Sequence, residues 1–171
     1  IKRAALNEAK GSLNELFGHI NSTAGDMREN FNLSLVSSEY PNRGEFFTDL
    51  IEKLKGDALP TISEIERLWF EIQREMIESG RIVQYTATVA TPAGDDIEAQ
   101  VTRVGSFNIV TNDGQYLKYS DDSLSILPRQ PSSAFVNWAS DLAGANEGYS
   151  RFGIDPTGPV SYTHLRAHET D

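Results

Sequence analysis

The order of hydrophobic repeats along this chain of 171 residues predicts an α+β fold. Three segments repeat their apolar residues every three to four positions, the spacing becomes two from Arg81 onward, and a helical spacing returns after Pro131. Consecutive strands without helices between them favour an antiparallel sheet. We therefore expect a long helical arm, two further helices, and a small antiparallel β-meander or partial barrel closed by a helix.

The first helical segment carries the longest apolar stripe. Its average spacing of about 3.57 residues lies between the coiled-coil value of 3.5 and the straight-helix value of 3.6. Because such a stripe needs a partner, we expect an oligomerisation or docking surface here. The stripe consists of Leu6, Ala9, Leu13, Leu16, Ile20, Ala24, Met27 and Phe31, and the candidate interface residues are Leu6, Leu13, Leu16, Ile20, Met27 and Phe31.

The chain is expected to divide into three parts. Residues 1–40 form the arm, which we expect to continue an upstream coiled coil, because the first helix begins without a capping residue. Residues 41–158 form the α+β domain. Residues 159–171 resemble a vector-derived end, and we exclude them from the fold.

Two shorter helices are expected after the arm. The first contains Phe46 to Leu54, and the second begins at a capping box of Thr61 and Glu64 and ends at Gly80. Six apolar residues line one face of the second helix: Ile62, Ile65, Leu68, Trp69, Ile72 and Met76.

Strands follow from Arg81 onward. The first alternates apolar and polar residues up to Val89, and the second runs from Ile97 to Val104. Asn112-Asp113-Gly114 predicts a hairpin turn, since Asn and Gly tolerate positive φ. The remaining elements are strands over Phe107–Thr111, Gln115–Tyr119 and Leu124–Leu127, and a helix over Ser132–Ala143.

Composition narrows the classes of partner. Lys and Arg total 15 against 25 Asp and Glu, so the net charge of -10 disfavours nucleic acid and anionic lipid. The chain has no cysteine, which removes disulfides and Cys-type zinc sites. No run of about 18 apolar residues occurs, so a link to a membrane is expected only through flanking segments.

The sequence offers no catalytic constellation, and we expect neither an enzyme nor a metal or cofactor site. His164 and His168, with Glu169, have the spacing of metal ligands on one helix face, but they belong to the excluded tail. His19 has no Ser, Asp or Glu spaced to form a relay with it. The pairs Asp95-Asp96 and Asp121-Asp122 are typical of turns.

Two further features allow more than one interpretation. Pro128-Arg129-Gln130-Pro131 reads either as an exposed polyproline ligand or, as we favour, as the end of a strand and the entry to a helix. Aromatic residues of the strands, Tyr85, Phe107, Tyr116 and Tyr119, are the candidates for a ligand- or cell-wall-binding face, although their alternation favours the core.

Six short strings, in this order and at these distances, resemble one known pattern. They are Leu13-Asn14-Glu15-Leu16-Phe17-Gly18, Glu66-Arg67-Leu68-Trp69-Phe70, Arg103-Val104-Gly105-Ser106-Phe107-Asn108, Gly114-Gln115-Tyr116-Leu117-Lys118-Tyr119, Leu127-Pro128-Arg129-Gln130-Pro131 and Ile154-Asp155-Pro156-Thr157. Together they resemble the extra N-terminal domain of long-form MotA/TolQ/ExbB-type proton-channel proteins, over roughly Ala4 to Thr157. The family-like positions are Trp69, Arg103, Gly105, Phe107, Gly114, Tyr116, Tyr119, Pro128, Arg129, Pro131, Asp155 and Pro156.

The resemblance implies a periplasmic domain of a bacterial inner-membrane complex that supports TonB-dependent biopolymer transport. In that family a coiled-coil region precedes the domain, and channel-forming membrane helices follow it. The implied partners are other subunits of the TonB-type complex, and the parent protein is implied to be a homo-oligomer. Any proton-conducting residues are implied to lie in the membrane helices, so this chain is expected to act through protein contacts.

Overall fold

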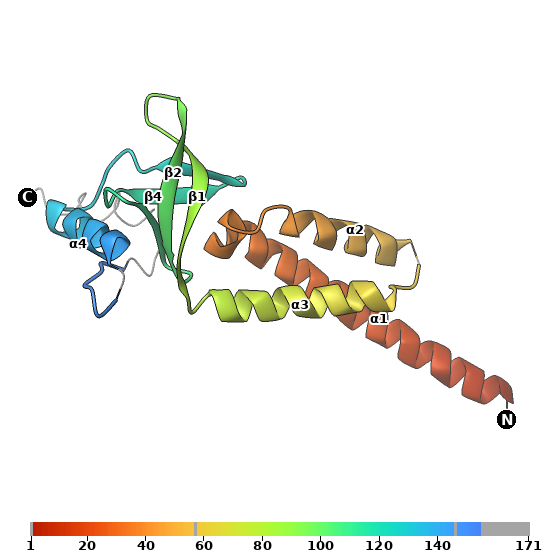
Figure 1. The fold of residues 1–171 in the computed structure, drawn as a ribbon. Coiled ribbons are helices and arrows are strands. Elements are labelled where there is room, and N and C mark those ends of the chain that lie inside the picture. Colours follow the sequence, from red (N-terminus) through yellow and green to blue (C-terminus); the bar gives the residue numbers. More distant parts are fainter. Residues whose placement is uncertain (1, 57, 146, 155–171) are drawn as a thin grey trace, which may run out of the picture. The chain divides into compact units, whose positions relative to one another are not determined.

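The computed structural model describes residues 2–56, 58–145 and 147–154, and it confirms the predicted α+β class. Over these residues the chain forms four α-helices and a closed five-stranded barrel (Figure 1). Among the described residues two compact units are present: a helical unit within residues 2–32 and 42–74, and a barrel unit within residues 33–41 and 75–154. This division differs from the expected boundary at residue 40, because two helices after the arm belong with the arm rather than with the strands.

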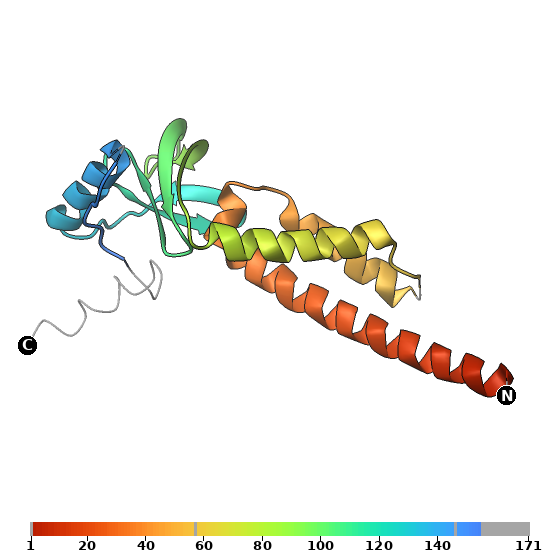
Figure 2. The same cartoon turned by 60° about the horizontal axis from the view of Figure 1, so that its bottom comes forward.

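The helical unit contains α1 (Lys2–Leu33), α2 (Arg43–Lys55) and most of α3 (Ile62–Glu78). The predicted capping box starts α3: the Thr61 N–H donates to Glu64 Oε2 at 2.6 Å, and the Glu64 N–H donates to Thr61 Oγ1 at 3.3 Å. The N-terminal part of α1 runs beyond the ends of α2 and α3 in both ribbon views (Figures 1 and 2).

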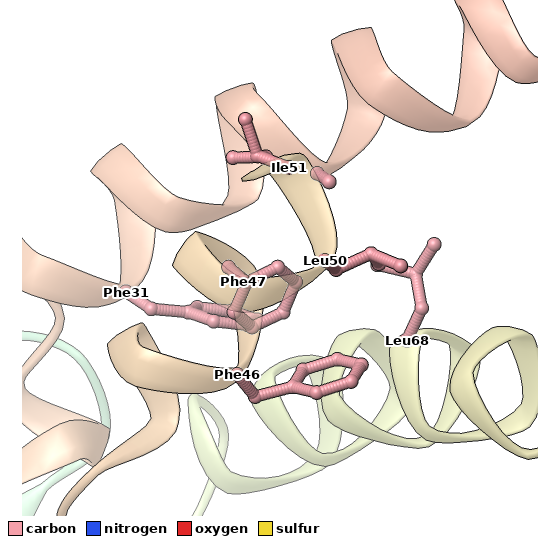
Figure 3. Close-up of a cluster of buried hydrophobic side chains, with 7 residues drawn as sticks. Phe31, Phe46, Phe47, Leu50, Ile51 and Leu68 are labelled. Carbon is pink, nitrogen blue, oxygen red and sulfur yellow. The ribbon is translucent and has the colours of Figure 1, made fainter. Parts of the chain in front are cut away.

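Aromatic rings form the centre of the helical unit (Figure 3). Phe47 is fully buried, and its ring lies edge-on to Phe31 and Phe46, with centroids 4.9 Å and 5.2 Å away. The same cluster also contains Ala24, Leu50, Ile51 and Leu68. Thus the C-terminal half of the α1 stripe is covered by α2 and α3 of its own chain.

The barrel unit is a five-strand meander that closes on itself. Each strand pairs antiparallel with the next, and the first and fifth strands pair in parallel through Val89↔Leu124 and Ala90↔Ser125. Strand direction alternates along a meander, so the ends of an odd number of strands can meet only in parallel. The strands are β1 (Ile82–Ala90), β2 (Asp96–Val104), β3 (Asn108–Thr111), β4 (Tyr116–Ser120) and β5 (Ser123–Ile126).

Alternation along β1 fills the barrel as the sequence predicts, whereas residues 101–104 of β2 and all of β3 are buried without alternation. Successive residues of β1 are alternately exposed and covered, and Val89 is fully buried. The interior cluster consists of Val89, Val101, Ile109, Leu117 and Leu124. Leu35 of the short 3-10 helix η1 (Leu35–Ser38) packs against this cluster.

Two tight turns set the register of the later strands. Asp121 and Asp122 have φ of 53° and 56° and connect the paired residues Ser120 and Ser123, which is the geometry of a two-residue hairpin loop. Asp121 and Asp122 therefore form a turn, as expected. At the predicted Asn-Asp-Gly hairpin, Gly114 has φ of 79° and its N–H donates to the Thr111 carbonyl at 2.9 Å.

Helix α4 (Ser133–Gly144) lies outside the barrel, and Ala139 packs with Val110 and Tyr116. Gln130 fixes the segment that leads into α4. Its side chain accepts a hydrogen bond from the Tyr116 N–H at 2.7 Å and donates to the Tyr116 carbonyl at 3.0 Å, as a neighbouring strand would. The segment from Pro128 to Pro131 thus joins β5 to α4, in agreement with the favoured interpretation.

Candidate interaction surface

Helix α3 turns a row of carboxylates toward the interior. Glu64, Glu71 and Glu78 recur every seven residues and so share one face of the helix. Glu71 and Glu78 retain only 4% and 5% of their exposure. Buried carboxylates persist where cations and hydrogen bonds compensate them, and each of these three has such partners.

In the helical unit the partner is Arg43, which is itself 3% exposed. Arg43 Nε donates to Glu71 Oε2 at 3.0 Å, and the guanidinium carbon lies 4.0 Å from the ring centroid of Phe31. Arg74 Nη1 also donates to Glu71, at 3.2 Å from either carboxylate oxygen. This arrangement stabilises a charge within an otherwise apolar cluster.

Glu64 lies nearer the surface at the first turn of α3. The hydrogen bond from Lys53, followed by those from the Thr61 backbone and side chain, lowers the pKa of Glu64 from 4.5 to about 2. Lys53 Nζ approaches Glu64 Oε2 to 2.8 Å and so links α2 to α3. The carboxylate therefore combines a helix cap with an ion pair.

The opposite face of α3 is apolar and exposed, which the sequence did not indicate. Ile62 is 77% exposed, Ile65 40% and Trp69 61%, whereas Ile72 packs against the buried cluster of the helical unit. Met76, in the same spacing, is also exposed. Contiguous exposed apolar side chains mark interaction surfaces, so this face is the candidate functional site of the helical unit.

The expected interface residues of α1 have unequal environments. Phe31 is 1% exposed and belongs to the core, and Ile20 and Met27 pack against that core, so these three contact their own chain rather than a free surface. Leu16 is 51% exposed. For Leu6 and Leu13, the structure describes only the helical backbone of α1.

One end of the barrel is closed by a buried charge. Arg103 follows Val101 by two positions on β2, so it points inward, and it is fully buried. Arg103 Nη2 donates to Glu39 Oε2 at 2.7 Å and to Glu78 Oε2 at 3.0 Å. Arg103 Nη1 donates to the carbonyls of Glu78 and Gly105, at 2.7 Å and 3.1 Å.

Tyr85 lies beside this cluster and shares a hydrogen bond with the Ser38 hydroxyl. Burial, which is the largest influence, raises the pKa of Tyr85, and the Ser38 hydrogen bond opposes it. Gly105 completes the end of the barrel, because its φ is 56° and a Cβ would lie 2.4 Å from the Ser79 carbonyl oxygen. Arg103 and Gly105, named for the resemblance, thus both help to close the barrel.

The other family-like positions are scattered over the chain. Pro128 and Arg129 are exposed and Pro131 is half-buried, whereas Asp155 and Pro156 lie outside the described residues. Tyr85 and Tyr119 pack against the interior cluster of the barrel, and Tyr116 belongs to the cluster under α4. Tyr116 stacks on Phe152 and donates to the Gly153 carbonyl, Tyr119 donates to Asp122, and Phe107 is 44% exposed. Three of the four rings thus pack in the core, as their alternation predicts.

Within the described residues, no group of three or more His, Asp or Glu side chains is arranged to hold a metal ion. His164, His168 and Glu169 lie outside that part of the chain. The helices described also include none whose length and apolarity would allow it to cross a membrane.

Comparison of the chain with protein-family models, with curated proteins and with solved structures gives no match in any of the three.

Sequence reasoning missed two features that the structure brings out. The first is the burial of Arg103, although a signal was present: a charged residue in the inward position of an alternating strand needs a buried partner. The second is the direction of α3. The seven-residue spacing of Glu64, Glu71 and Glu78 indicates a second, polar face, whose carboxylates need cations or hydrogen-bond donors when they are buried.

Proposed function

We propose that this chain is a non-catalytic periplasmic domain of a bacterial inner-membrane proton-channel complex that supports TonB-dependent transport. The observation that carries this proposal is the set of six strings in register that resemble the N-terminal domain of long-form MotA/TolQ/ExbB-type proteins. The domain acts through contacts with other subunits. Proton flow through a separate membrane part is gated by, or transmitted through, those contacts.

Two structural observations support an interaction role. The outward face of α3 exposes Ile62 and Trp69, and the stripe on α1 leaves Leu16 exposed. Side chains of this kind, gathered on a helix, favour binding to another protein. Under this proposal, proton conduction takes place in the membrane segments that the resemblance implies, and not in this chain.

Co-purification tests the proposal. We expect the immobilised chain to retain subunits of a TonB-type complex from solubilised inner membranes of its source, and an unrelated acidic periplasmic protein to retain none. The variants Trp69→Ser and Phe107→Ser remove an exposed ring from α3 and from the barrel unit, so the loss of capture by one of them identifies the contacting unit. If the folded chain retained no such subunit, the proposal would be wrong.

A further inference from the structure

Strand β2 is longer than the strand that pairs with its outer edge. β1 pairs with β2 along its whole length, but β3 pairs only with residues 101–104 of β2. Within the described part of the chain, residues 96–100 therefore have no strand on the side away from β1. We call these five residues the open edge; they belong to the β1–β2 hairpin, whose tip projects beyond the other strands in both ribbon views (Figures 1 and 2).

The hydrogen bonds of the hairpin show which backbone groups face the open edge. The Thr91 N–H donates to the Asp95 carbonyl at 2.8 Å, so these two residues point their backbone groups at each other across the hairpin. In an antiparallel pair this direction alternates from one residue to the next. The N–H and C=O groups of Asp96, Glu98 and Gln100 therefore point away from β1.

These outward groups are accessible. Asp96, Glu98 and Gln100 are all exposed, and no hydrogen bond between described backbone groups reaches the N–H and C=O groups that they turn outward. An exposed row of alternating donors and acceptors is a template on which an extended chain adds as a further strand. The occupant that fits the open edge is therefore an extended segment.

The side chains of β2 define what such a segment meets on each face. Ile97 and Ala99 point to the same side as the buried Val101; Ala99 packs against the interior cluster and Ile97 is 42% exposed. Asp96 and Glu98 point to the opposite side. An added strand thus has an apolar row beside one of its faces and two carboxylates beside the other.

Charge selects the occupant. Asp95, Asp96 and Glu98 are the only charged residues between positions 82 and 102. If the open edges of two copies paired antiparallel about Glu98, the two Glu98 carboxylates would lie opposite each other and repel, which disfavours a second copy. Basic residues at alternate positions of a partner would instead lie opposite carboxylates, and the apolar residues between them would cover Ile97 and Ala99.

The outer edge of β1 has a different character. Its outward positions, Gln84, Thr86 and Thr88, are uncharged. The Gln84 side chain already donates to the Ala143 carbonyl of α4 at 2.6 Å. The basic segment is therefore expected on β2 and not on β1.

We propose that the open edge of β2 binds an extended segment of another protein in which basic and apolar residues alternate, and that this segment extends the sheet by one strand. Backbone hydrogen bonds to Asp96, Glu98 and Gln100 hold the segment, and the carboxylates select its sequence. The inference goes beyond the proposed function, because it names the chemistry of one partner and holds whichever complex contains the chain.

Fluorescence anisotropy with labelled peptides tests the proposal on the full chain. The probe has the sequence Gly-Thr-Val-Lys-Val-Lys-Val-Gly, and the control peptide carries glutamate in place of both lysines. We expect saturable binding of the lysine probe and a dissociation constant at least about tenfold larger for the glutamate peptide.

Two substitutions at Glu98 separate the backbone contribution from the charge. Glu98→Pro removes an outward N–H without taking a hydrogen bond from the β1–β2 pair, so the dissociation constant of the lysine probe should rise about tenfold or more. Glu98→Lys should weaken the lysine probe and strengthen the glutamate peptide, a reversal that loss of folding cannot produce.

Matched controls make the same changes away from the open edge. Thr86→Pro alters an outward position of β1, and Asp141→Lys reverses an exposed carboxylate on α4. Both variants should bind the lysine probe as the wild type does. Circular dichroism of each variant shows whether the fold is retained.

Amide hydrogen exchange locates the bound probe. The amides of Asp96, Glu98 and Gln100 should become protected when the lysine probe binds, and that of Thr86 should not change. The inference would be overturned by a lack of saturable binding up to about 1 mM probe or by equal affinity for the two peptides. Equal losses for Glu98→Pro and Thr86→Pro, or protection on β1 in place of β2, would overturn it as well.

Discussion

The helical unit and the barrel unit each bury one arginine against a glutamate of α3, but the two arginines have different surroundings. Arg43 sits beside Phe31 in a cluster of seven buried apolar residues, and its partner Glu71 has a second cation in Arg74. Arg103 instead connects Glu39, Glu78 and the Gly105 carbonyl at the end of the barrel. The comparison indicates that the buried charge supplements an apolar core in one unit and joins separate segments in the other.

The largest expected effect comes from removing these arginines. Arg103→Met removes four hydrogen bonds and leaves Glu78 with only Arg81, whose side chain is 58% exposed, so we expect a loss of about 3–5 kcal/mol in the free energy of unfolding. Arg43→Met should cost less, about 1–3 kcal/mol, because Glu71 keeps Arg74 and the methionine packs against Phe31. Equal losses in the free energy of unfolding for the two variants would contradict the difference inferred between the two arginines.

Each unit has one tryptophan, so the two effects can be measured separately. Trp69 lies in the helical unit and Trp138 in the barrel unit, edge-on to Phe135. Denaturant unfolding followed by tryptophan fluorescence in a Trp69→Phe background reports on the barrel unit, and the Trp138→Phe background reports on the helical unit. The arginine variants are made in both.

The next effect concerns the contact of the β3–β4 hairpin with α4. A Cβ at Gly114, where φ is 79°, would lie 2.0 Å from the Val136 carbonyl oxygen, whereas Gly94, with φ of 93°, has no atom within 4 Å of such a Cβ. Gly94→Ala should therefore cost only backbone strain, about 1–2 kcal/mol. Gly114→Ala should cost about 1–3 kcal/mol more, because α4 must also shift.

Thermal unfolding of the two glycine variants measures this difference. Similar midpoints for Gly94→Ala and Gly114→Ala would mean that α4 does not hold the hairpin. A lower midpoint for Gly114→Ala alone would support the view that a few close contacts, such as that of the hairpin with α4, hold the segments of the barrel unit together.

Alkaline pH is expected to weaken the barrel unit. Burial raises the pKa of Tyr85 above its ordinary value of 10.0. The stability that the neutral phenol contributes is complete below pH 10 and is lost as the pH rises through the folded-state pKa. In the Trp69→Phe background, Tyr85→Phe should remove this loss, and Tyr149→Phe, a change at an exposed tyrosine, is the control.

Acid is expected to weaken the helical unit, with the smallest effect of the four. The folded-state pKa of Glu64 is lowered to about 2, so the stabilisation by its carboxylate is complete above its ordinary pKa of 4.5 and is lost as the pH falls toward 2. Glu64→Gln should flatten the pH dependence of unfolding in this window in the Trp138→Phe background. Glu66→Gln, on the exposed side of α3, is the matched control, and an equal flattening by both would contradict the assignment.

Much of the fold could be predicted from sequence because its signals are local. The 3.6-residue repeat located α1, the Thr61 and Glu64 pair located the start of α3, and alternation up to Val89 assigned the inward face of β1. The Asn-Asp-Gly segment gave its hairpin because Gly114 supplies the positive φ. Each of these features depends on residues close together in the chain.

The candidate interaction surface could not be predicted in the same way. The sequence placed Ile62 and Trp69 on one face of α3 but did not show whether that face is covered. The answer depends on Arg43, which compensates Glu71 from 28 positions away and so allows the polar face to be buried. Closure of the sheet is a similar case, because it depends on the pairing of β1 with β5, which lie far apart in the sequence.

The parallel pairing of β1 with β5 has a consequence for the order in which the chain folds. Val89 meets Leu124, so the barrel cannot close until β5 has been synthesised. Until then, both outer strands present unpaired backbone groups on which other chains can add. Pairing over such a separation in sequence is also slow to form. Strand β5 ends at Ile126, directly before Leu127-Pro128. A chain truncated within this strand should therefore aggregate during expression.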